Sequence, residues 1–283
     1  MKNKLTTVLL VLVFLAGLSL LLYPTVSNYY NSVHQTQAIL DYAQNVDALE
    51  QEAYEALWAE AEEYNQAMAR ERRYAIPLGY EDRYTSMLDA SGRGVMAYVE
   101  IPSIEVTLPI MHGTSDSVLE KAVGHLEWSS LPIGGESTHC VISGHRGLPS
   151  SELFTNIDHL EIGDIFYIHV LGQTLEYWVD NIAVVLPNEY ELLGITQGQD
   201  YVTLLTCTPY GINSHRLLVR GSRVFRDETT QSPDLILKNE VESIDMMVLL
   251  PVLLVALSAV VFITVAITGS KKKRRKDKNH GQK

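Results

Sequence analysis

The stretch Tyr201-Val-Thr-Leu-Leu-Thr-Cys-Thr-Pro-Tyr-Gly-Ile-Asn-Ser-His-Arg-Leu-Leu-Val-Arg-Gly221 reads as two strands joined by a short loop. A β-branched, apolar run leads into Cys207, turn residues end it, and the second strand begins at Arg216. In an antiparallel hairpin the end of one strand lies beside the start of the next, so we expect Cys207 and Arg216 to be neighbours at one rim. A thiol beside a guanidinium combines a nucleophile with a permanent cation at the place where oxyanion charge would develop.

This hairpin is the last part of a series of short runs of β-branched and apolar residues that are separated by turn residues. They cover residues 95–101, 106–110, 138–143, 165–170, 174–186, 201–208 and 216–225, with helical patches at 115–123 and 151–160. About eight short strands with few helices are typical of a mainly-β domain, either a closed β-barrel or a sandwich. We therefore expect one β-domain over residues 94–226.

A helical segment precedes this domain. Residues 31–73 contain no Gly or Pro and are rich in residues that favour helix. Their apolar positions recur at helical spacing, at Leu40, Ala43, Val46, Leu49, Ala53, Leu57, Ala61 and Tyr64. The pattern favours a helical stalk that packs on the following domain over a dimerising coiled coil.

Charge is divided sharply along the chain. The 283 residues have a net charge of −12, but the two lysines before residue 5 and the eight Lys/Arg residues in 271–283 are separated by a strongly acidic middle. A compact nucleic-acid binder carries its positive charge on the folded part, so that class of function is disfavoured. Basic ends around an acidic middle indicate a membrane protein.

Two uncharged apolar runs, 5–22 and 246–268, are long enough to cross a bilayer of roughly 30 Å. The basic cluster 271–276 follows the second run and stays cytoplasmic by the positive-inside rule. No small-residue cleavage site follows the first run, which favours an uncleaved anchor over a cleaved signal peptide. The predicted order is a cytoplasmic start (1–4), a transmembrane helix (5–22), an extracellular stalk (23–75), a loop (76–93), the β-domain (94–226), a linker (227–245), a second transmembrane helix (246–268) and a basic cytoplasmic tail (269–283).

A catalytic thiol needs an acid/base partner, and His145 is the best candidate. It ends a predicted strand and enters the loop His145-Arg-Gly-Leu-Pro149, and functional side chains are commonly displayed on such loops. His215 should point to the opposite face from Arg216, and four further histidines look structural: His125, His139, His159 and His169.

Other interpretations remain open on the residues alone. Cys207 could be a small buried hydrophobe, or it could form a disulfide with Cys140. No residues have metal-ligand spacing, and Ser143 lacks the G-x-S-x-G context of a serine hydrolase.

The motif Thr203-Leu-Leu-Thr-Cys207, with Arg216 downstream and Ser143-Gly-His145-Arg-Gly147 upstream, resembles the sortases, the cysteine transpeptidases of Gram-positive cell surfaces. The likeness covers residues 94–225, and the stalk with a second span resembles class C, the pilus-assembly group. This resemblance implies an eight-stranded closed β-barrel. It also implies Cys207 as nucleophile, Arg216 as oxyanion stabiliser, His145 as acid and base, and Thr206 in shaping the substrate groove.

The same resemblance implies a reaction and its partners. An LPxTG-like sorting signal of a pilin would be cleaved between Thr and Gly and joined to a lysine amine of another pilin subunit, with no cofactor. The alternatives are anchoring to a peptidoglycan precursor, or a non-enzymatic pilus-assembly scaffold. Class C enzymes often carry an Asp-Pro-aromatic lid, which residues 75–84 lack. Either 76–78 with Tyr80 forms a different lid or the cleft is open, and we favour the open cleft.

Overall fold

The computed structural model describes residues 2–71, 74–225, 256 and 259–260. The chain forms two compact units, Met1–Tyr29 with Leu237–Lys283 and Tyr30–Ile236. The predicted linker 227–245 and tail 269–283, and nearly all of the predicted second span 246–268, lie outside the described residues.

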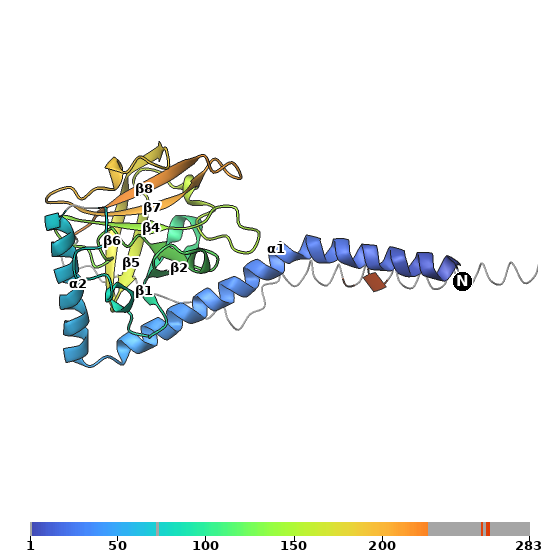
Figure 1. Ribbon diagram of the computed structural model, residues 1–283, viewed down its shortest axis with the longest axis horizontal. Helices are drawn as coiled ribbons and strands as arrows, with labels where there is room; N and C mark the ends of the chain where they lie inside the picture. Colours follow the sequence, from blue (N-terminus) through green and yellow to red (C-terminus); the bar gives the residue numbers. More distant parts are fainter. Residues whose placement is uncertain (1, 72–73, 226–255, 257–258, 261–283) are drawn as a thin grey trace, which may run out of the picture. The chain divides into compact units, whose positions relative to one another are not determined.

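Eight strands close into one barrel in the order β1-β2-β3-β4-β7-β8-β6-β5 (Figure 1). The predicted mainly-β barrel is therefore confirmed, and the sandwich is wrong. The pairs β2·β3 and β4·β7 are parallel and the other six are antiparallel. The strands are β1 (Val95–Ile101), β2 (Val106–His112), β3 (Val123–His125), β4 (Thr138–Ser143), β5 (Ile165–Val170), β6 (Gln173–Val185), β7 (Asp200–Thr208) and β8 (His215–Arg223).

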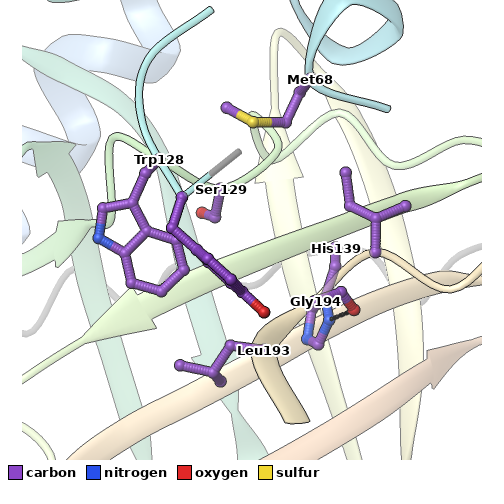
Figure 2. A pocket seen from close by; sticks show the side chains of 8 residues that line it. Met68, Trp128, Ser129, His139, Leu193 and Gly194 are labelled. Atoms are coloured by element: carbon purple, nitrogen blue, oxygen red, sulfur yellow. Dashed lines mark hydrogen bonds between the residues drawn. The ribbon is translucent and has the colours of Figure 1, made fainter. Parts of the chain in front are cut away.

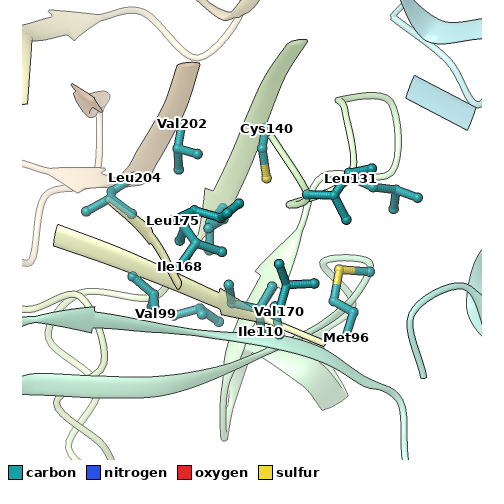
Figure 3. Close-up of a cluster of buried hydrophobic side chains, with 14 of the residues drawn as sticks. Met96, Val99, Ile110, Leu131, Cys140, Ile168, Val170, Leu175, Val202 and Leu204 are labelled. Carbon is teal, nitrogen blue, oxygen red and sulfur yellow. The ribbon is translucent and has the colours of Figure 1, made fainter. Parts of the chain in front are cut away.

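The barrel interior is filled by apolar side chains that alternate along the strands (Figure 3). On β7, Val202 and Leu204 are buried in this core, while Thr203 between them faces the other side. Cys140 on β4 belongs to the same core and is 2% exposed. Because successive strand residues point to opposite faces, this inward set leaves Leu205 and Cys207 on the outer face of β7.

Two helices precede the barrel, α1 (Lys2–Asp47) and α2 (Gln51–Glu71), and α2 lies beside it (Figure 1). The hydroxyl of Tyr42 on α1 donates to Met96 O and accepts from Leu171 N–H, each at 2.9 Å. On α2, Asn65 donates to Leu131 O and accepts from Leu131 N–H. The stalk therefore packs on the barrel, and the predicted continuous helix is interrupted at residues 48–50.

Within the described residues, one helical stretch is long and apolar enough to cross a membrane. It is Leu9–Asp47 of α1, whose most apolar 18-residue window has a mean hydropathy of 2.4 and no buried residues. This stretch overlaps the predicted first span at 5–22.

The remaining helices are one-turn elements. The predicted helical patches 115–123 and 151–160 shrink to α3 (Asp116–Leu119) and η3 (Ile157–His159), since turns occupy most of the remaining residues and Val123 begins β3. The other short helices are η1 (Tyr84–Ser86), η2 (Pro102–Ile104) and η4 (Glu191–Leu193). In the predicted loop 76–93, Tyr80 packs edge-on against Tyr64 of α2 and the Tyr84 hydroxyl bonds to His125 Nδ1 at 2.8 Å.

Replacing Tyr42 with Phe should destabilise the fold by about 1–3 kcal/mol, because the buried Met96 carbonyl and Leu171 amide each lose a hydrogen-bond partner. Chemical denaturation measures this loss. Tyr54→Phe is the matched control, since the Tyr54 hydroxyl bonds only to an exposed Gln173 side chain among the contacts described. Equal stability of the two variants would contradict the assigned role of Tyr42.

The fold should also lose stability as pH falls from 7 to 5. Burial lowers the pKa of both His125 and His139 from 6.5 to about 4. The unfolded chain therefore binds protons at these histidines below about pH 6.5, whereas the folded chain does not bind them until about pH 4. The free energy of unfolding falls as a result by up to about 2 kcal/mol per histidine at pH 5. Thermal unfolding at a series of pH values measures this dependence. His125→Asn should flatten it and the exposed His159→Asn should not; identical slopes in both variants would refute the cause.

Candidate active site

The hairpin of β7 and β8 brings Cys207 and Arg216 together. The two residues are directly paired across the antiparallel strands. Each is half-buried, and each lies on the outer face of its strand because Thr206 and Leu217 beside them point inward. The pairing is the one that the hairpin sequence predicts.

His145 is carried toward the same rim by the parallel strand β4. Ser143 pairs with Leu205, and Gly144 N–H then donates to Leu205 O at 3.0 Å. A Cβ on Gly144 would lie 2.7 Å from the Phe154 ring, so only glycine allows the Phe154 side chain to pack this close to the segment before His145. Two residues beyond the Ser143–Leu205 pair, the chain reaches His145 in the loop after β4 and Cys207 on β7. His145, Cys207 and Arg216 are all half-buried at this end of the barrel.

Thr206 has a different position from these three residues. Its side chain is fully buried, and its hydroxyl donates to Gly144 O at 2.8 Å. The bond connects the residue before Cys207 to the residue before His145. Any contribution of Thr206 to a groove on the outer face would therefore be indirect, through the backbone that it holds.

The two thiols differ in environment. Both cysteines are free, and Cys140 lies in the core, where burial raises the pKa of its thiol well above the usual value. The alternative of a Cys140–Cys207 disulfide is therefore wrong, because the two side chains occupy opposite faces of the barrel wall. Among the described residues, no group of three His, Cys, Asp or Glu side chains could hold a metal ion.

Two of the other histidines, His125 and His139, are held by hydrogen bonds away from this rim. His125 Nε2 bonds to Ser130 O at 2.9 Å, and His139 bonds through Nδ1 to Gly194 O and through Nε2 to the Thr203 hydroxyl. Both rings are buried and neutral at pH 7, since burial lowers the pKa of each to about 4. They serve as structural residues rather than as proton donors.

An apolar strip leads along the outer barrel face toward Cys207. We call it the outer cluster; its members are Val141, Leu193 and Leu218, with partly buried Leu126, Trp128, Val185 and Leu205 against them. The cross-strand pair Leu205–Leu218 lies two residues before the pair Cys207–Arg216 and on the same face. Val141, Leu193 and Leu218 are almost fully buried, so near the thiol only partly buried members such as Leu205 and Val185 reach the surface.

A cavity of about 190 Å³ adjoins the outer cluster (Figure 2). Trp128 and Leu193 belong to both, and Met68, His139 and Gly194 contribute further lining. Tyr74 also lines it, packing edge-on against Trp128 and donating its hydroxyl to Tyr190 O at 3.3 Å. The cavity extends the apolar strip away from the thiol toward α2.

Sequence reasoning missed the outer cluster. Val141, Leu205 and Leu218 follow the alternation of their strands, so a count of outward apolar positions could have found them. Trp128 and Leu193 come from loops between strands and carry no comparable signal. The arrangement as a whole pairs a thiol with a guanidinium at the end of an apolar strip, with His145 two residues beyond the neighbouring Ser143–Leu205 pair, and a thiol beside a cation suits nucleophilic acyl transfer.

Comparisons with known proteins match the barrel domain to sortases. The Sortase domain model matches residues 99–224. Sortase C1 from Streptococcus agalactiae is 46% identical with a TM-score of 0.65, over 68% of this chain and all of that one. Sortase C from Clostridium perfringens, solved with a C-terminal cell wall sorting motif, is 43% identical with a TM-score of 0.60, over 67% and 99%. Sortase C from Streptococcus pneumoniae, whose structure is described as informative on catalysis and pilin substrate specificity, is 42% identical with a TM-score of 0.59, over 67% and 97%.

A bulky maleimide should label one thiol in the folded protein and two after denaturation, because Cys207 is half-buried at the surface and Cys140 is enclosed in the barrel. Intact-mass spectrometry counts the labels, and Cys207→Ala should remove the one acquired by the folded protein. Rapid labelling at neutral pH is expected for the open cleft. Labelling only after unfolding would show instead that a lid covers Cys207.

Proposed function

Since this chain belongs to the sortase family of cysteine transpeptidases, we propose that it polymerises pilin subunits at the cell surface. Its substrate is an LPxTG-like sorting signal, cleaved between Thr and Gly, and its acceptor is a lysine amine of another pilin. The observation that carries this proposal is the direct pairing of Cys207 with Arg216 at the end of the outer cluster. Similarity to class C sortases, one solved with a sorting motif, supports the choice of substrate.

The reaction proceeds through a thioester. The sulfur of Cys207 attacks the Thr carbonyl carbon, and the oxygen takes up negative charge next to the Arg216 guanidinium. The C–N bond to glycine breaks as His145 donates a proton to the departing amine, which leaves Thr bound to sulfur. A lysine amine then attacks this thioester, His145 accepts its proton, and an isopeptide bond forms as the Cys207 thiolate leaves.

The outer cluster explains the apolar start of such a signal. Leu and Pro side chains would pack against Val185 and Leu205, the partly exposed members of this cluster on the strands beside Arg216 and Cys207, with the following Thr carbonyl at Cys207. Thr206 contributes by holding Gly144, and through it the backbone that precedes His145. No cofactor enters any step.

The proposed location follows from the apolar segments. α1 anchors the enzyme in the membrane, the predicted span 246–268 crosses it again, and the basic tail 269–283 stays in the cytoplasm. The barrel then faces the exterior, where pilin subunits are assembled. The acidic middle of the chain is consistent with partners other than nucleic acid.

The full-length enzyme in detergent, incubated with purified pilin, should produce a ladder of covalent polymers on a denaturing gel. Cys207→Ala should abolish the ladder and the thioacyl adduct detected by mass spectrometry. Arg216→Ala should slow adduct formation roughly 100- to 1,000-fold, because the developing oxyanion loses its cation. Cys140→Ala is the matched control and should retain activity, since that thiol lies inside the barrel.

Three outcomes would redirect the proposal. A ladder that persists in Cys207→Ala would remove Cys207 as the nucleophile. Transfer to a peptidoglycan precursor but not to pilin lysine would favour anchoring of surface proteins. Binding of pilin with no adduct in the unmodified enzyme would favour a non-enzymatic scaffold.

A further inference from the structure

We propose that Arg146 is a positioning residue that fixes the loop of His145 against the segment following Cys207. This inference rests on the proposed function, because it concerns the distance between the side chains of His145 and Cys207 in the proposed reaction. The contacting groups are Arg146 with Gly147, Asp158, Thr208 and Tyr210, which we call the clasp. Arg146 adjoins His145 in the chain, and Thr208 adjoins Cys207.

The Arg146 guanidinium is held on two sides. Its Nη2 donates to Asp158 Oδ2 at 2.5 Å, and its Nη1 reaches Thr208 Oγ1 at 3.4 Å. Only about a tenth of the Arg146 side chain is exposed, against about a third of Asp158. A planar guanidinium can contact both groups in a fixed geometry, which an ammonium on a flexible stem cannot reproduce.

The loop between β7 and β8 contacts Arg146 from a third side. The Arg146 Cζ lies 5.9 Å from the centroid of the Tyr210 ring. A Cβ on Gly147 would lie only 2.8 Å from that ring, and Gly147 has φ +77, a conformation that favours glycine. Gly147 N–H also donates to the Thr155 hydroxyl at 3.1 Å. The loop after β4 and the loop after β7 are therefore in contact through Arg146, Gly147 and Tyr210.

The clasp contains a feature that stability alone does not explain. Among the described residues, the buried Nε of Arg146 has no hydrogen-bond partner. Burying a charged group with an unmet donor is unfavourable, and apolar side chains of similar volume often fill such a site at least as well. What the guanidinium adds is a directional link between two loops that, among the described residues, no backbone hydrogen bond joins beyond the bond from Gly144 N–H to Leu205 O.

This link matters because acyl transfer depends on geometry. The proton donated by His145 must reach the amine that leaves the carbon bound to Cys207, and a displacement of about 1 Å can lower such a rate by about 100-fold. Since the clasp residues are neither the proposed catalytic residues nor members of the outer cluster, loss of the clasp should affect the rate of chemistry and leave peptide binding unchanged.

The test uses the full-length enzyme in detergent, an LPxTG-type peptide, and the variants Arg146→Ala, Arg146→Lys and Asp158→Asn. Thioacyl formation should slow roughly 10- to 100-fold in Arg146→Ala, with the peptide KM within about twofold of the original. Arg146→Lys should not restore the rate, and Arg146→Ala combined with Asp158→Asn should be no slower than the slower single variant. Arg83→Ala, which removes an exposed Arg83–Glu60 ion pair, is the matched control and should keep its rate.

Two results would overturn the clasp. The first is a folded Arg146→Ala variant that forms the thioacyl adduct at a rate within about twofold of the original enzyme. The second is a slower rate of adduct formation that occurs only together with a raised KM and a lowered melting temperature. If Arg146→Ala does not fold, the near-isosteric Asp158→Asn must show the same loss of rate with unchanged KM, or the inference fails.

A substrate-free measurement separates this inference from the proposed function. Iodoacetamide should alkylate Cys207 roughly threefold or more faster in Arg146→Ala, because the end of β7 opens more often. An unchanged alkylation rate would refute the clasp. A thioacyl product formed by Cys207→Ala would instead refute the proposed function, while the alkylation result would still decide on the clasp.

Discussion

The register of β7 against its two neighbours is the constraint on which the site depends. Its pairing with β8 sets Cys207 opposite Arg216, and its pairing with β4 sets Leu205 opposite Ser143, two residues before His145. A slip of one residue in either ladder would turn the thiol into the barrel or the guanidinium away from it. The closed barrel prevents such a slip, because every strand is bonded on both sides and the inward side chains fill a single core.

The same alternation gives the two cysteines opposite properties. Cys140 behaves as a small apolar side chain in the core, and burial raises the pKa of its thiol so that it stays protonated. Cys207 lies on the outer face beside a cation, at the end of an apolar strip. The chemical difference between two identical side chains therefore comes from strand parity and from the residue across the ladder, not from any feature of the cysteines themselves.

Much of this fold could be predicted from local sequence. The β7–β8 hairpin, the alternating strands and the helical stalk all carry short-range signals, and the loop position of His145 follows from the strand before it. β3 was missed because a Val-Gly-His run of three residues is too short to show a period, and the break between α1 and α2 was missed because no Gly or Pro marks it. The clasp and the cavity lined by Trp128 depend on loops that meet only in the folded barrel, so no spacing in the chain predicts them.

The parallel pairing of β4 with β7 has a consequence for biogenesis. These strands are far apart in sequence, with β5 and β6 folded between them, so their ladder is a contact of high contact order. The last strand of the barrel must also be present before β7 is bonded on both sides. Because the chain is synthesised from its N-terminus, most of its length is made before β8 can pair with β7, so the topology delays the meeting of Cys207 and Arg216 until the barrel is nearly complete.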